Sequence, residues 1–231
     1  MKTVLQVRHG DVTGDQVANL VYLTAVQTAD SPFLQEITLV IQDRRTADAY
    51  RVALPENSGY NPTVFLGDFT GNKVKDILVV IDTGGSGGTI YAYVFSFLNG
   101  RFYTIFNGEV FNQRTKYTVR YENHYKAEVT SSEPNKRYVL DLTTKGTDYL
   151  AEIYNKDGTL KQPIEGWVSP LSGLYPIDFD RNGVYELTAW QSIAGRYNAD
   201  RLGYVQNVLQ WNGRSFETIE QYVSILGEER E

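Results

Sequence analysis

The sequence contains no cysteine and only two histidines, His9 and His124. Without cysteine the chain cannot form a disulfide, use a thiol as a nucleophile or build a cysteine-based zinc site. The absence does not fix the compartment in which the protein works. Neither histidine has a motif partner nearby, and no Gly-x-Ser-x-Gly elbow is present. We therefore predict no catalytic pair built from Ser, Thr or either His, and a non-enzymatic chain.

Long apolar runs and clusters of positive charge are missing too. No run of about 18 apolar residues occurs, so no transmembrane helix is expected. The first residues lead into a strand-like segment without an apolar signal-peptide core, so no signal peptide is visible in this chain. Lys and Arg number 22 against 28 Asp and Glu, which gives a net charge of −6. An acidic chain without a basic run argues against nucleic acid and against electrostatic docking to anionic lipid.

Strand-like segments dominate what remains. The 17 Tyr and 10 Phe suit β-sheet surfaces. Short apolar segments of about five to ten residues alternate with turn signals, which is typical of all-β proteins. They include residues 33–41, 89–97, 137–142, 149–154 and 202–211. No convincing long amphipathic helix appears, so the sequence predicts an all-β fold.

Three loops share one spacing of oxygen-bearing side chains, at positions 1, 3, 5 and 9. The first carries Asp11, Thr13, Asp15 and Asn19; the second carries Asp68, Thr70, Asn72 and Asp76; the third carries Asp178, Asp180, Asn182 and Glu186. Position 7 is valine in all three, at Val17, Val74 and Val184. A short apolar segment follows each loop directly, which places each loop at the entry of a strand.

Such spacing favours a hard cation. Ca²⁺ takes six to eight oxygens, and the four side chains plus the carbonyl at position 7 could supply five. An EF-hand is excluded, because its Glu at position 12 is replaced by Tyr22, Val79 and Ala189. The sequence predicts Ca²⁺ at these loops, strongest at the third, which offers three carboxylates. The alternative is three ordinary turns, since Asp, Asn, Thr and Gly are common turn formers.

The loops resemble the calcium loops of FG-GAP or VCBS-type β-propeller repeats. The stretch from Gly67 to Phe97 also resembles uncharacterised secreted VCBS-repeat proteins of spore-forming Gram-positive bacteria. The resemblance implies a calcium-stabilised propeller outside the cell or on its surface. The sequence departs from the pattern at Thr13, Asn19 and Thr70, where the repeats carry acidic residues. Those departures weaken the calcium prediction at the first two loops.

The loop spacing also predicts internal repeats. Asp11 and Asp68 lie 57 residues apart, and Asp68 and Asp178 lie 110 apart, or twice 55. A degenerate copy is expected at residues 121–129, which lack the oxygen spacing. Asn99-Gly100 and Asn212-Gly213 mark equivalent hairpins. We therefore predict one domain of four units, near residues 1–60, 61–115, 116–170 and 171–231, forming a four-bladed β-propeller. A compact β-sandwich or an open stack of β-repeats is the alternative.

Function follows mainly from the resemblance. We expect a calcium-stabilised extracellular or cell-surface module that binds a protein or a glycan. The alternatives are a glycan-acting hydrolase with carboxylates in a propeller channel, and a purely structural coat or wall component. The sequence names neither the ligand nor the oligomeric state.

Overall fold

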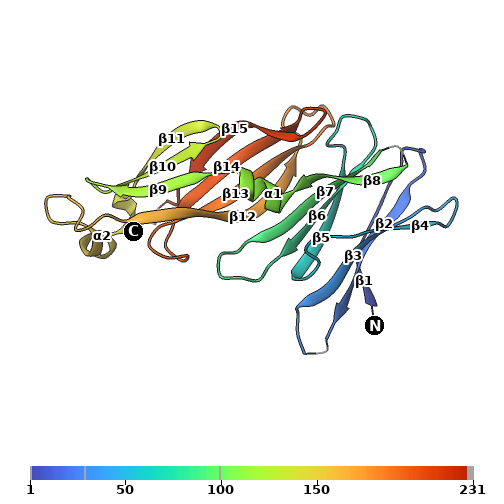
Figure 1. Ribbon diagram of the computed structural model, residues 1–231, viewed down its shortest axis with the longest axis horizontal. Helices are drawn as coiled ribbons and strands as arrows, with labels where there is room; N and C mark the ends of the chain where they lie inside the picture. The colour runs from blue at the N-terminus through green and yellow to red at the C-terminus, as the bar shows by residue number, and fades with distance from the viewer. Residues whose placement is uncertain (1, 29, 99, 228–231) are drawn as a thin grey trace.

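Three antiparallel sheets follow one another along the long axis of the computed structural model, which describes residues 2–28, 30–98 and 100–227 (Figure 1). The first sheet contains β1 (Lys2–Gly10), β2 (Asn19–Gln27), β3 (Leu34–Gln42) and β4 (Ala49–Val52). The second contains β5 (Tyr60–Gly67), β6 (Asp76–Asp82), β7 (Ile90–Leu98) and β8 (Arg101–Asn107). In both, each strand pairs with the next strand in sequence.

The third sheet is larger, with seven strands in the order β11-β10-β9-β12-β13-β14-β15. Its second half, the four-stranded meander, consists of β12 (Glu165–Ile177), β13 (Glu186–Ala194), β14 (Arg201–Trp211) and β15 (Phe216–Ser224). Its first half consists of β9 (Tyr117–Glu122), β10 (Lys126–Ser132) and β11 (Asn135–Asp141). Each of the three sheets therefore contains one four-stranded meander.

The helices are short. Helix α1 (Gly108–Arg114) connects the second and third sheets, and its first turn is capped by Asn107, whose side chain accepts from the backbone N–H groups of Glu109 and Val110. The 3₁₀ turn η1 (Thr143–Lys145) and helix α2 (Thr147–Ile153) lie between β11 and β12. Helix α2 corrects the expectation of a strand at residues 149–154. Its short segment carries no decisive period, and tertiary contacts override strand propensity there.

The sheets pack face to face through two apolar cores. Strand β2 alternates, so that Val21, Leu23 and Ala25 are fully buried on one face. They meet Ile77, Val79 and Ile81, the face of β6 that points back toward the first sheet. The opposite face of β6, with Leu78 and Val80, meets Leu187 and Ala189 of β13. We call the face that points toward the following sheet in this series the forward face, and the face that points toward the preceding sheet the back face. Only the second sheet contacts a neighbour on both faces.

A third core lies inside the seven-stranded sheet, which curves until it is nearly a closed barrel. Strands β9 and β10 supply Val119, Ala127 and Val129, which pack against Ile193 and Val205 of β13 and β14. Hydrogen bonds close the curve, because the Tyr138 hydroxyl donates to the Gln221 carbonyl at 3.0 Å. Strands β9–β11 thus cover the back face of the meander β12–β15 where the second sheet does not reach.

The all-β prediction is confirmed, but the four-bladed propeller is wrong. The strands form three sheets, and the segment expected as a third blade adds β9–β11 to the same sheet as the fourth. The physical reason is visible at residues 121–129, where β9 and β10 join through a short hairpin whose His124 and Tyr125 have positive φ. This segment lacks the oxygen-bearing loop, and its hairpin keeps β9 and β10 in one sheet.

Candidate functional site

The three predicted loops occupy the same place in the fold. Each joins the first and second strands of a four-stranded meander, at β1–β2, β5–β6 and β12–β13. Positions 4 and 6 have positive φ in all three loops. Glycine takes position 4 in the first two loops, as Gly14 and Gly71, and position 6 in the third, as Gly183. The common spacing therefore encodes one backbone conformation, used three times.

The carboxylate at position 1 organises its own loop. Asp68 accepts hydrogen bonds from the backbone N–H groups of Thr70, Gly71 and Lys73, at 3.1, 2.7 and 2.7 Å. Asp11 accepts from the same three positions of the first loop. Asp178 accepts from Asn182 and Gly183. These carboxylates therefore cap backbone donors, as Asx turns do.

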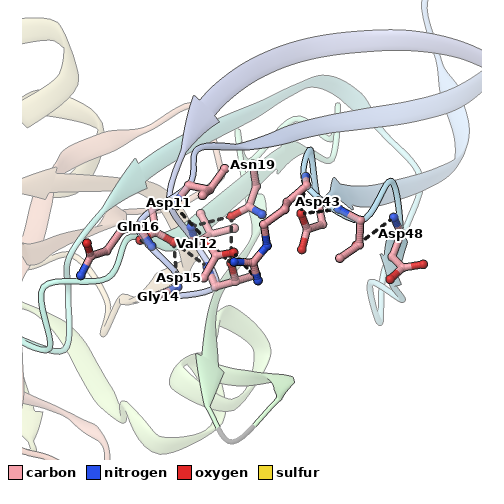
Figure 2. A network of polar contacts seen from close by, with 12 residues as sticks. Asp11, Val12, Gly14, Asp15, Gln16, Asn19, Asp43 and Asp48 are labelled. Atoms are coloured by element: carbon pink, nitrogen blue, oxygen red, sulfur yellow. Dashed lines mark hydrogen bonds and ion pairs between the residues drawn. The ribbon is translucent and has the colours of Figure 1, made fainter.

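Positions 5 and 9 repeat the capping. Asp15, Asn72 and Asn182 each accept from the N–H of the valine two residues on. At position 9, Asn19, Asp76 and Glu186 accept from the N–H at position 2. Figure 2 shows this network around the first loop, with Asp43 in the neighbouring β3–β4 turn. Arg45 of that turn adds an ion pair to Asp15 at 3.3 Å.

All three position-9 side chains are buried, and Glu186 is 4% exposed. Asn19 is inaccessible to solvent and Asp76 is 1% exposed. Burial raises the pKa of Asp76 above its ordinary value, although the neighbouring Ser96 hydroxyl and the N–H of Phe69 oppose the shift. Its Oδ1 has no hydrogen-bond partner among the described residues. A buried carboxylate with one unused oxygen is costly in its charged form.

Across residues 2–28, 30–98 and 100–227, no group of three or more His, Cys, Asp or Glu side chains is arranged to hold a metal ion. The loop oxygens lie close to one another in sequence but mainly accept from backbone N–H groups, as the turn-former alternative describes. Calcium binding at the residues named above is untested and stays a prediction.

The loops also contact one another. The N–H of Lys75, at position 8 of the second loop, donates to the carbonyl of Asp11, at position 1 of the first, at 3.0 Å. The N–H of Tyr185 donates to the carbonyl of Asp68 in the same way, at 2.7 Å. Both bonds join position 8 of one loop to position 1 of the preceding loop. The three loops thus form a row that ties the ends of the three sheets together.

Side chains reinforce both junctions. Valine at position 7 lies against position 4 of the preceding loop, so that a Cβ on Gly14 would stand 3.0 Å from Val74 Cγ2. A Cβ on Gly71 would stand 3.7 Å from Val184 Cγ2. The row ends at the third loop, where position 4 is the exposed Arg181 instead of glycine.

The end of the row leaves one sheet face without a following sheet. Position 2 is fully buried in the first two loops, at Val12 and Phe69, but Phe179 in the third is 55% exposed. The forward face of β13 carries Thr188, Trp190 and Ser192 where β2 carries Val21, Leu23 and Ala25. Hydroxyl groups and an indole therefore replace the aliphatic side chains of the internal contacts.

Aromatic rings gather on this forward face. We call Tyr175, Ile177, Trp190, Tyr204 and Tyr222, which the register places on one side of β12–β15, the aromatic face. Tyr175 is 50% exposed and Tyr222 is 49% exposed. The Trp190 ring centroid lies 5.6 Å from that of Tyr175 and 5.4 Å from that of Tyr204. Among the described residues, Trp190 Nε1 and Thr188 Oγ1 have no hydrogen-bond partner.

A charged cluster lies at the end of β13 and β14 that is opposite the third loop. Asp200, 3% exposed, accepts from the hydroxyls of Tyr121 and Tyr149 at 3.2 and 2.9 Å. It pairs with Lys145 at 3.0 Å and with Arg196 at 3.7 Å. Burial alone would raise the pKa of Asp200, but the Arg196 N–H, Lys145 and Tyr149 together lower it. The cluster fixes the β13–β14 turn against η1 and α2.

Comparison with known proteins shows which family this chain belongs to. The uncharacterized protein YybI of Bacillus subtilis (strain 168) is 59% identical over 226 residues, which cover 98% of this chain and 86% of the relative. The chain belongs to the YybI family. The model of the YybI C-terminal domain matches residues 115–224, which correspond to the seven-stranded sheet of this YybI-family chain. No solved structure gives a significant match.

The family corrects the sequence-based resemblance. No FG-GAP or VCBS repeat family matches, so the identification as a calcium-loop propeller of those families is wrong. The resemblance arose from the turn spacing, which any loop with the same Asx capping requires. No helix among the described residues is long and apolar enough to cross a membrane.

Sequence reasoning did not identify the aromatic face. Its residues come from four strands, and their exposure depends on which sheet face lacks a neighbour. A signal was nevertheless present. Aligning the three loops by position shows that Thr188 and Trp190 replace Val21 and Leu23. Polar and aromatic residues at positions that are aliphatic in the other repeats indicate a face with a different role.

Proposed function

We propose that this chain is a non-enzymatic binding module, working outside the cell or on its surface, that takes up a glycan on its aromatic face. The observation that carries the proposal is the forward face of the third sheet. It is equivalent to two faces that bury aliphatic side chains, yet it has no following sheet among the described residues. Exposed aromatic residues grouped on one face are typical of binding sites.

The side chains favour a sugar over another protein sheet. Sugar rings offer C–H groups to aromatic rings and hydroxyl groups to polar side chains. On the aromatic face the half-buried Gln206 and the tyrosine hydroxyls supply polar groups beside the rings, whereas the hydroxyls of Thr188 and Ser192 are buried. A further sheet packed in the internal manner would instead bring a valine against position 4 of the third loop. Arg181 stands there, and its charge would be buried by that contact.

The extracellular setting follows from the proposed ligand and is itself a proposal. This binding mode does not require calcium, because no residue of the aromatic face is one of the oxygen-bearing residues at positions 1, 3, 5 and 9 of the loops.

Affinity electrophoresis tests the proposal. The protein is run through gels that contain polygalacturonate, hyaluronate or hydroxyethyl cellulose, and is mixed separately with insoluble chitin and peptidoglycan. We expect retardation or capture by at least one of them. Tyr175→Ala removes a half-exposed ring and should weaken that binding about tenfold, the upper end of what one aromatic contact contributes.

Tyr103→Ala is the matched control. Tyr103 is 47% exposed on β8, away from the aromatic face, and its loss should leave binding unchanged. Failure of every polysaccharide to bind, or equal binding by Tyr175→Ala, would overturn the proposal. Release of soluble sugar during the incubation would show that the chain is an enzyme instead.

A further inference from the structure

A line of side chains crosses the aromatic face diagonally and ends at a cation. Tyr175 on β12, Trp190 on β13 and Tyr204 on β14 are successive neighbours. The Arg201 guanidinium lies over the Tyr204 ring, 5.1 Å from its centroid. In the register of β13 and β14, Arg201 lies opposite Ala194, which is on the same face as Trp190. The guanidinium therefore lies on the same side of the sheet as the aromatic face.

Arg201 differs from the other cations at this end of the sheet. Lys145 pairs with Asp200, and Arg196 pairs with both Asp200 and Glu152. Arg201 is exposed and pairs with no carboxylate among the described residues. Counted over the described residues, with Asp200 and Glu152 ionised, the group of Lys145, Arg196 and Arg201 has one more positive than negative charge. That charge stands at the edge of the aromatic face in a chain whose net charge is −6.

The backbone of Arg201 is held in place. Its carbonyl accepts from Lys145 Nζ at 3.1 Å, and its N–H donates to the carbonyl of Ala199 at 3.0 Å. The ring of Tyr204 supports the guanidinium from below. A planar guanidinium fixed at one end leaves donors free for a carboxylate, which it can bind through two hydrogen bonds.

The opposite end of the line has the opposite charge. Residues Tyr175 and Ile177 lead into the third loop, where Asp178 and Asp180 lie beside the exposed Phe179. Glu220, which accepts from the Tyr222 hydroxyl, adds a further carboxylate to this face, and the exposed Arg181 stands beside the loop acids. A carboxylate of the ligand is therefore repelled over much of the aromatic face and attracted at Arg201. Resting on the proposed function, we infer that the glycan is acidic and that one of its carboxylates sits at Arg201.

The test compares polygalacturonate with the same polymer after methyl esterification, which removes the carboxylate charge and keeps the sugar rings. The wild-type protein should bind the acid about two- to fivefold more tightly than the ester, the range that one exposed ion pair gives. Arg201→Gln should lose this preference, and Arg201→Lys should retain part of it. Arg44→Gln, an exposed arginine of the first sheet, controls for the change in net charge.

The outcomes separate the two proposals. If the wild-type protein and Arg201→Gln bind acid and ester equally while Tyr175→Ala binds both about tenfold more weakly, the carboxylate inference fails and the glycan site stands. If Tyr175→Ala binds as the wild-type protein does, the aromatic face is not the site and both proposals fail. A preference for the acid that Arg201→Gln abolishes and Arg44→Gln keeps supports the inference.

Discussion

Asp68 accepts three backbone hydrogen bonds within the second loop and so orders the turn between β5 and β6. Asp11 does the same in the first loop. The carboxylates that alternate along the sequence are explained by this capping, because each short polar side chain meets N–H groups two to five residues ahead. At the scale of the residue, the spacing describes the hydrogen bonds of a turn.

Asp68→Ala tests whether an ion contributes as well. The substitution leaves three N–H groups without their acceptor, so we expect a loss of about 1–2 kcal/mol of unfolding free energy. The loss should be equal in calcium and in chelator, measured by thermal or urea unfolding. Asp68→Asn keeps one acceptor oxygen and should fall between the two proteins. A loss of unfolding free energy that is seen in calcium and not in chelator would support an ion site in this loop.

Asp76 gives a second prediction at this scale. Burial raises its pKa in the fold, so its contribution to stability is complete below the ordinary pKa of aspartate and declines as the pH rises through the higher folded value. The first loop uses Asn19 at the same position. Asp76→Asn should therefore match or exceed the wild-type protein in stability at pH 7.

The measurement is urea unfolding across the acidic and neutral range. The advantage of Asp76→Asn should grow from about pH 4 upward, because only the wild-type protein must keep a buried charge there. If the stability of Asp76→Asn relative to the wild-type protein fell between pH 4 and pH 7, the ionised carboxylate would have a favourable partner in the fold.

At the scale of the element, the hairpins follow from local sequence more closely than their packing does. The three loops and the strands that leave them could be predicted because the turn residues and the apolar alternation are local. Helix α2 could not, since residues 149–154 lack a decisive period. The aromatic face could not either, because Trp190 and Leu23 occupy equivalent positions in equivalent strands. Only the presence or absence of a following sheet separates their environments.

The loop junctions give a prediction for two elements together. Gly14→Ala and Gly71→Ala both place a side chain at positive φ, which costs about 1–2 kcal/mol. Gly14→Ala should be the more destabilising, because its Cβ would stand 3.0 Å from Val74 Cγ2 against 3.7 Å for the other pair.

A double-mutant cycle measures the contact by urea unfolding. Val74→Ala should recover about 0.5 kcal/mol or more of the loss caused by Gly14→Ala. Val184→Ala with Gly71→Ala is the matched pair and should show additive losses. Additivity in both pairs would mean that the loops do not touch in solution as they do in the structure.

At the scale of the whole molecule, the three sheets share their cores. The second sheet has no apolar face of its own, since one face belongs to the core with the first sheet and the other to the core with the third. A sheet that separates from its neighbours exposes both partners' buried side chains. We therefore expect the molecule to unfold in one cooperative transition.

Calorimetry of two core variants checks this. Leu23→Ala lies between the first and second sheets, and Leu187→Ala between the second and third. Each should cost about 2–5 kcal/mol and lower the same single transition. Two resolved transitions, with each variant lowering a different one, would show that the seven-stranded sheet unfolds independently of the N-terminal sheets.

Each junction in the row of loops joins a backbone N–H to a backbone carbonyl, so the hydrogen bond itself does not depend on the side chain at position 8, which is Lys75 at one junction and Tyr185 at the other. In this sense, one loop can replace another as the connection between the first two strands of a meander. A nine-residue loop moved from one hairpin to another would bring its own turn and its own connector. The exception is the third, whose Arg181 fits only at the end of the series.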